Sequence, residues 1–311
     1  MKYISYERDG LQSIGIISQG RICDIPGAYR SFGRTGMSNT MADFLRHFDD
    51  NHRIVTDMLS DVDPNRRPEL FFPEGQVNLL PPVPEPRSLR IYFGSKTYLQ
   101  TAAKFYGQDI LPDTLERPVF YFGNHQSILP PGSDLRLPRN TTQLDYELHL
   151  AMVVGRKGRN IRTEDARRYL AGFSTMNNWI SRNIDHPIGK HMLYPPKSHD
   201  FGTSLGPCLV SIDELDSNRM QDKYDLRMTA TINSELYTEG NSSGYSYSFS
   251  ELLSDASRNC TLYPGDIISA GCIESGSILG LGRDVWLQPG DTVALEVDGL
   301  GLLESSVGEP E

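Results

Sequence analysis

The sequence predicts a β-rich α+β protein with a small N-terminal β domain over residues 1–80 and a larger domain over residues 87–308. Short β-like segments separated by Gly, Pro and Asn fill most of the chain, and helical patterns are few. Strands do not alternate regularly with helices, which argues against a doubly wound sheet or an α/β barrel. Residues 80–86 contain four prolines, which exclude both helix and central strand and place the domain boundary there.

The individual elements follow from local patterns. Residues 3–25 alternate apolar and polar side chains between glycine turns, which predicts an antiparallel meander. The apolar spacing of residues 40–59 suits one or two helices. In the larger domain Thr163 is predicted to cap a helix with acidic residues in its first turn. Later strands are predicted at residues 226–232, 267–270 and 293–297.

Composition narrows the functional classes. The 311 residues carry a formal net charge of -10, which argues against the phosphate-neutralising surface that nucleic-acid binding needs. No apolar run is long enough to span a membrane and no signal-like segment opens the chain, so the default expectation is a cytoplasmic protein. The four cysteines lack metal-binding or disulfide-framework spacing and are expected to be free thiols.

Four segments of the larger domain occur in a recognisable order. They are Pro-Val-Phe-Tyr-Phe-Gly-Asn at 118–124, Asp-Tyr-Glu-Leu-His-Leu-Ala at 145–151, Gly-Phe-Ser-Thr-Met-Asn-Asn-Trp-Ile-Ser-Arg at 172–182, and the lysine-bearing loop at 197–207. Together they resemble the fumarylacetoacetate hydrolase superfamily over roughly residues 87–308. The resemblance implies a mixed β-roll for this domain, a small-molecule substrate and a homodimer.

The resemblance also implies a divalent cation held by carboxylates, but most of those carboxylates are replaced here. Of the family's Glu-x-Glu pair only Glu147 remains, His149 stands in the second position, and Asn178 replaces an aspartate. One carboxylate, one imidazole and one amide attract Mg²⁺ weakly, so no cofactor is predicted; Zn²⁺ or Mn²⁺ remains an alternative because imidazole suits softer ions. Strand alternation places Glu147 and His149 on one face, so they are alternatively a simple hydrogen-bonded pair.

The family's water-activating histidine is also replaced. The matching position holds Tyr98, or Thr101 in a second register, and neither deprotonates near neutral pH. Lys197 matches the family's lysine and would stabilise an enolate, with Thr203 as a hydroxyl donor in the same loop. Arg182 also matches, as a substrate-binding residue or as half of a buried ion pair.

Other side chains are candidates for the pocket wall. Tyr121, Asn124 and His125 follow the first matching segment, although a loop histidine is commonly solvated. Cys272 falls where relatives carry a threonine and is expected to line the pocket without acting as a nucleophile, because no histidine is recognisably paired with it.

Three functions remain open on these residues. The leading hypothesis is an enzyme that acts on an enolisable dicarbonyl or 2-oxo-acid-like small molecule by metal-independent proton transfer, as an isomerase, cyclase, dehydratase or decarboxylase. In it Lys197 holds the developing oxyanion while the catalytic side chains Tyr98, His149 and Glu147 move protons. The alternatives are a carbon–carbon hydrolase with an atypical metal bound by Glu147, His149 and Asn178, and an inactive homologue that serves as a binding or subunit partner.

Overall fold

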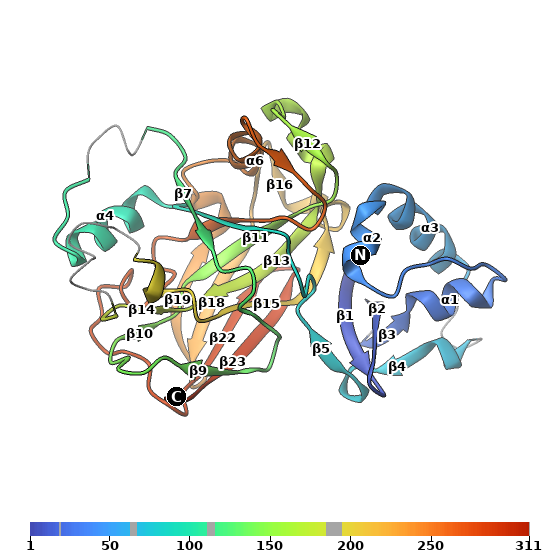
Figure 1. The fold of residues 1–311 in the computed structure, drawn as a ribbon, viewed down its shortest axis with the longest axis horizontal. Coiled ribbons are helices and arrows are strands. Elements are labelled where there is room, and N and C mark those ends of the chain that lie inside the picture. Colours follow the sequence, from blue (N-terminus) through green and yellow to red (C-terminus); the bar gives the residue numbers. More distant parts are fainter. Residues whose placement is uncertain (19, 63–66, 111–115, 185–194, 311) are drawn as a thin grey trace.

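The computed structural model describes residues 1–18, 20–62, 67–110, 116–184 and 195–310. The N-terminal part forms an antiparallel meander with helices packed on one side, at the right of Figure 1. Its elements are β1 (Lys2–Arg8), β2 (Leu11–Ser18), β3 (Arg21–Asp24), α1 (Ile25–Ser31), α2 (Met41–Arg46), α3 (Phe48–Ser60), β4 (Phe71–Pro73) and β5 (Asn78–Leu80). The predicted meander and the helices of residues 40–59 are therefore confirmed.

One large mixed sheet runs through both parts of the chain. Strand β1 pairs with the following meander strand on one side and with a strand of the larger part on the other, at Lys2 and Tyr3. The order is β4, β3, β2, β1, β15 (Thr203–Ser211), β13 (Leu170–Asn178), β11 (Leu148–Val154), β21 (Ile267–Cys272), β6 (Leu89–Tyr92) and β7 (Phe120–Gly123), with β5 beside β1 and β8 (Ile128–Leu129) beside β15. The N-terminal part is thus joined to the larger one by backbone hydrogen bonds.

A second sheet packs against the large one and closes the core. Its order is β19 (Glu235–Asn241), β18 (Arg227–Ile232), β22 (Thr292–Val297), β23 (Gly301–Pro310) and β9 (Asp134–Leu137). Short strand pairs complete the fold: β10 (Leu144–Asp145) with β14 (Ile180–Ser181), β12 (Gly158–Arg159) with β20 (Thr261–Leu262), and β16 (Arg219–Met220) with β17 (Lys223–Tyr224). The β-rich mixed architecture matches the predicted fold class.

Among the described residues of the larger part, helices are few and short. They are α4 (Lys96–Phe105), α6 (Phe249–Ser257) and 3₁₀ turns at Thr163–Tyr169, Pro196–Ser198, Ile212–Asn218 and Ser242–Gly244, while Pro68–Leu70 and Glu74–Gln76 form 3₁₀ turns in the N-terminal part. The helix expected at Thr163 is a 3₁₀ helix whose N-cap position is Arg162 and whose first turn receives no side-chain cap. No described helix is long and apolar enough to cross a membrane.

The two faces of strand β11 pack against different parts of the molecule. Leu148 and Leu150 join the core between the two sheets, whereas Ala151 and Val153 belong to a second cluster that includes the N-terminal helices. Glu147 and His149 share the face of Ala151 and Val153, as the period of two along a strand requires. The predicted alternation is confirmed, and it puts the polar site on the side of the large sheet facing away from the second sheet.

Candidate functional site

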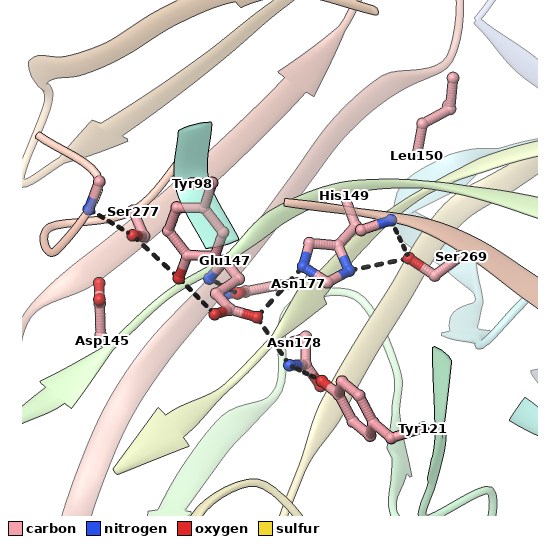
Figure 2. Close-up of polar contacts among 12 residues, drawn as sticks. Tyr98, Tyr121, Asp145, Glu147, His149, Leu150, Asn177, Asn178, Ser269 and Ser277 are labelled. Carbon is pink, nitrogen blue, oxygen red and sulfur yellow. Dashed lines mark hydrogen bonds and ion pairs between the residues drawn. The ribbon is translucent and has the colours of Figure 1, made fainter. Parts of the chain in front are cut away.

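The Glu147 carboxylate lies at the centre of a buried polar network. Its side chain is about 2% exposed, and four donors reach its two oxygens. The Tyr98 hydroxyl donates to Oε1 at 2.5 Å and Arg182 Nη2 donates to the same oxygen at 3.2 Å. Asn178 Nδ2 donates to Oε2 at 2.9 Å, and His149 Nε2 lies 3.2 Å from that oxygen (Figure 2). Because an ionised carboxylate has about four lone-pair sites, this one is saturated.

Arg182 links Glu147 to a second buried carboxylate. Its guanidinium donates to Asp145 Oδ2 from Nε at 3.1 Å and from Nη2 at 2.8 Å, and both side chains are fully buried. Asp145 also accepts the backbone N–H groups of Ile278 and Leu279 at 2.8 and 3.2 Å. The expected buried ion pair of Arg182 is therefore present, and it places a fixed positive charge beside Glu147.

Tyr98 enters this network from helix α4. The Ser95 side chain accepts the backbone N–H of Tyr98 and so caps the first turn, which fixes the start of the helix above the sheet. The Tyr98 hydroxyl oxygen in turn accepts hydrogen bonds from Arg182 Nη2 at 2.7 Å and from Ser277 Oγ at 3.4 Å. Tyr98 thus joins the site, whereas Thr101 donates to its own helix at the Thr97 carbonyl.

His149 is held at both ring nitrogens. Nδ1 lies 2.8 Å from Ser269 Oγ, and Ser269 Oγ also accepts the backbone N–H of Gly271 at 3.1 Å. Figure 2 shows the resulting line of contacts from Ser269 through His149 and Glu147 to Tyr98, with Leu150 turned the other way. The three contacts of this line measure 2.8 Å from Ser269 to His149, 3.2 Å from His149 to Glu147 and 2.5 Å from Glu147 to Tyr98, which suits proton movement along it.

The network keeps Glu147 ionised. Burial alone raises the pKa of its carboxyl, but the hydrogen bond from His149 and the charge of Arg182 outweigh burial and hold the pKa well below its usual value. Glu147 is therefore an anion throughout the physiological range. An anion this strongly stabilised orients its donors and is a poor base by itself.

A small cavity adjoins the network. It has a volume of about 10 Å³, enough for about one water molecule, and it is lined by Tyr98, Tyr121, Glu147, His149 and Cys272 together with aromatic and aliphatic side chains of β6 and the residue after it. Burial raises the pKa of the Cys272 thiol well above its usual value, so the thiol stays neutral. Cys272 lines the cavity, and its chemistry does not suit a nucleophile.

Several other predicted residues lie around this centre. Asn178 Nδ2 also donates to the Tyr121 hydroxyl at 3.1 Å, which brings Tyr121 into the network. Thr203 is buried on β15 directly opposite Asn178. Asn124 has a structural role instead, because its amide donates to Ser127 Oγ and to the Asp200 carbonyl.

Lys197 and His125 lie outside the network. The Lys197 side chain is 70% exposed and pairs with the Asp200 carboxylate at 2.7 Å. His125 is exposed on its loop. Neither contacts Glu147. The Lys197 ammonium, which the resemblance assigns to oxyanion stabilisation, instead lines a separate cleft of about 560 Å³, called the loop cleft, together with Asp200 and Arg136.

Sequence reasoning overlooked two residues that the fold brings to the site. Asp145 precedes Glu147 by two positions, so strand alternation was a usable signal for it. His199 is buried, and its ring packs edge-on against Tyr121 with centroids 4.6 Å apart. Burial lowers the pKa of His199 to about 4, which keeps its ring neutral at physiological pH. Its position in the lysine-bearing loop gave no signal of burial.

The two packed sheets form a mixed β-roll, with the polar network on one of them. The chain belongs to the fumarylacetoacetate hydrolase family: the family model described as fumarylacetoacetate (FAA) hydrolase C-terminal matches residues 91–308. The family resemblance drawn from the four sequence segments is thereby confirmed.

Curated relatives are named as enzymes. A mitochondrial oxaloacetate tautomerase of Rattus norvegicus is 29% identical over 194 residues, which are 62% of this chain and 59% of that protein. An oxaloacetate tautomerase of Bacillus subtilis is 29% identical over 235 residues, 75% of this chain and 74% of that protein. The chain thus spans about three-fifths of the length of the mammalian relatives it matches.

Solved structures share the fold over the whole chain. A fumarylacetoacetate hydrolase from Exiguobacterium antarcticum has a TM-score of 0.74 at 23% identity and covers 99% of both chains. A maleylpyruvate hydrolase from Sphingobium sp. SYK-6, solved with a manganese(II) ion and pyruvate, has a TM-score of 0.74 at 19% identity and covers 100% of both chains. Identities this low establish the fold alone.

The donor set of this chain does not fit a hard divalent cation. Glu147 already has four protein donors, and one of them is the Arg182 guanidinium, which repels a cation. The Asn178 amide donates its N–H group to Glu147 Oε2 at 2.9 Å. In the flipped orientation the amide oxygen would lie at that distance from an ionised carboxylate oxygen, which would repel it. Among the described residues, no three His, Cys, Asp or Glu side chains converge in a metal-holding group.

Proposed function

We propose that this protein is a tautomerase or isomerase for an enolisable 2-oxo acid and that it works by proton transfer without a bound metal ion. The observation that carries the proposal is the water-sized cavity beside the line Tyr98–Glu147–His149. The relatives named oxaloacetate tautomerases support the reaction class, because interconverting a keto and an enol form requires only that a proton leave one atom and reach another.

The cavity suits a single oxygen atom of the substrate. A space that holds one water molecule also holds one oxo or enol oxygen, and the Tyr98 hydroxyl forms part of its wall. Arg182 and Ser277 both donate to the Tyr98 oxygen, so they stabilise negative charge there if Tyr98 passes its proton onward. The enol oxygen would therefore lie beside the Tyr98 hydroxyl, which can give a proton to that oxygen or take one from it.

The carboxylate connects this phenol to a second proton-carrying group. The Tyr98 hydroxyl donates to Glu147 Oε1 at 2.5 Å while Oε2 faces His149, so the carboxylate orients both groups. In the enol-to-keto direction the enol oxygen loses a proton to this network and the neighbouring carbon gains one from it. The protein then ends with the same number of protons as it began.

The test is a direct assay of tautomerisation. The enol form of a 2-oxo acid absorbs in the ultraviolet, so its decay can be followed with and without the protein, and the incorporation of deuterium at the carbon next to the oxo group can be followed by NMR in D₂O. We expect faster enol decay and faster deuterium incorporation with the protein present. Release of a carboxylic acid by carbon–carbon cleavage would instead identify a hydrolase, and no reaction across 2-oxo acids and 1,3-dicarbonyls would leave the inactive-homologue hypothesis.

A further inference from the structure

Strand β21 carries a β-bulge beside the imidazole of His149. The register pairs His149 with Cys272 and Ala151 with Ser269, so two steps along β11 match three steps along β21, and β21 has one extra residue there. Gly271 lies in this bulge with φ of +92°, and a Cβ at its position would collide with a neighbouring backbone carbonyl oxygen. The bulge therefore requires glycine at this position.

The side chain of Tyr245 closes the gap that the bulge leaves between the two strands. Its hydroxyl accepts the backbone N–H of Leu150 at 3.2 Å and donates to the Gly271 carbonyl at 3.0 Å, so it links β11 to β21 where their direct pairing is interrupted. The Tyr245 side chain is itself buried in the core. The bulge is thus held in place, with Ser269 beside His149 (Figure 2).

The hydrogen positions in this cluster follow from the number of donors and acceptors. Glu147 is ionised and can only accept, so the ring nitrogen of His149 that lies 3.2 Å from it, Nε2, carries a hydrogen. The Ser269 hydroxyl accepts the Gly271 backbone N–H at 3.1 Å, and its own hydrogen needs an acceptor because the side chain is fully buried. Among the described residues, that acceptor is His149 Nδ1, at 2.8 Å.

We propose that Ser269 is a positioning residue of the site, which holds His149 in the tautomer with its hydrogen on Nε2 and its lone pair on Nδ1. This inference rests on the proposed function for the reaction that the site performs. The other tautomer would place the hydrogen on Nδ1 and leave the buried Ser269 hydroxyl without an acceptor among the described residues, at a cost in free energy.

The tautomer limits where a proton can go. With its hydrogen on Nε2, the His149 ring donates to Glu147 and has no lone pair there to accept a proton from the carboxylate. The distances alone would let a proton cross the ring to Ser269, but the hydrogen positions do not. A proton that the carboxylate takes up is therefore kept on the side of Tyr98 and the cavity, where the proposed reaction returns it to the substrate.

The tautomer can be observed by NMR, because an imidazole nitrogen that carries a hydrogen and one that does not differ widely in ¹⁵N chemical shift. In protein labelled with ¹³C and ¹⁵N, through-bond correlation from the assigned backbone identifies the His149 ring among the seven histidines. We expect a hydrogen on Nε2 and none on Nδ1 at neutral pH. A hydrogen on Nδ1 of the wild-type protein would overturn the inference.

Two matched serine substitutions test the part that Ser269 plays. Ser269→Ala removes the partner of Nδ1, so the Nδ1 resonance should move and kcat for enol decay should fall about tenfold, with KM nearly unchanged because Ser269 does not line the cavity. Ser257→Ala is the control. Ser257 is also fully buried, accepts one backbone N–H and donates to one carbonyl outside the network, so both readings should stay at their wild-type values.

The two readings separate this inference from the proposed function. Circular dichroism establishes that each variant is folded, and the wild-type spectrum decides the tautomer even if Ser269→Ala does not fold. An Nδ1 resonance that Ser269→Ala leaves in place, or an unchanged kcat in that variant, would overturn the positioning role. If the spectra are as expected while no tautomerisation is detected, the tautomer stands and the proposed function fails.

Discussion

The Glu147 network and the loop cleft both combine acidic and basic side chains, yet they differ in solvent access and therefore in what their charges do. Arg182 is fully buried between Asp145 and Glu147, and every oxygen of both carboxylates has a donor. Lys197 is 70% exposed and has one partner. A buried charge without a compensating partner destabilises the fold, whereas an exposed charge exchanges partners at little cost in free energy. The charges of the network are thus fixed in their orientation, whereas those of the loop cleft can change partners.

The comparison is tested most strongly at Glu147. Glu147→Gln removes the negative charge but keeps the shape, so the Arg182 guanidinium loses part of its compensation and a buried donor faces the new amide. We expect a loss of about 3–5 kcal/mol in the free energy of unfolding, measured by urea denaturation. Glu235→Gln is the control, since Glu235 is exposed and its substitution should change stability by less than about 0.5 kcal/mol. A Glu147→Gln protein as stable as the wild type would show that the carboxylate is not matched by its neighbours.

The protonation of His199 should make the free energy of unfolding depend on pH. The pKa of His199 is about 4 in the folded protein and about 6.5 when unfolded, so the folded state binds fewer protons in between. Its contribution is present above pH 6.5 and is lost as the pH falls toward 4, by about 3 kcal/mol in total. The variant His199→Phe keeps a ring against Tyr121 and should lack this component. Parallel pH profiles for wild type and variant would contradict a buried neutral imidazole.

Substitution of Tyr98 distinguishes a role of its hydroxyl in the reaction from a role in folding alone. Tyr98→Phe removes the hydroxyl that lies between Glu147 and Arg182, and we expect turnover to fall about 100-fold or more while the free energy of unfolding falls by about 1–2 kcal/mol. Tyr146→Phe is the matched control: it also removes a buried hydroxyl, one bonded to Thr238 Oγ1 outside the network. It should cost similar stability and preserve turnover. Equal loss of turnover in both variants would assign Tyr98 a structural role only.

The smallest effect on stability is expected in the cleft. Lys197→Ala breaks an exposed ion pair with Asp200, and such pairs contribute about 0–1 kcal/mol. Denaturation should therefore give nearly the wild-type free energy of unfolding. A loss of stability comparable to that of Glu147→Gln would contradict the distinction between a buried network and an exposed ion pair.

Local patterns predicted the parts of this molecule that depend on neighbours in the sequence. The meander, the helices of residues 40–59 and the shared face of Glu147 and His149 all follow from periodicity. Helix α4 was overlooked, although its buried residues Tyr98, Leu99, Ala102 and Ala103 recur at helical spacing.

Contacts between distant segments could be predicted only in outline, through the family resemblance that places Tyr98, Glu147 and Arg182 in one site. The saturation of Glu147 depends on Tyr98, 49 residues earlier, and on Arg182, 35 residues later. Nothing in the chain near Glu147 indicates that both will arrive at the same oxygen. Lys197 shows the converse: its type suited an oxyanion, but the fold pairs it with Asp200, three residues on, in a separate cleft.

The proposed function rests on protein donors surrounding Glu147 at the place where the family resemblance implies a metal ion. The most direct measurement is the rate of enol–keto interconversion of a 2-oxo diacid by protein treated with chelator and analysed for metal content. We predict an unchanged rate with far less than one metal ion per chain, and no response to added Mn²⁺ or Mg²⁺. A rate that chelation abolishes and that stoichiometric Mn²⁺ restores would contradict the account.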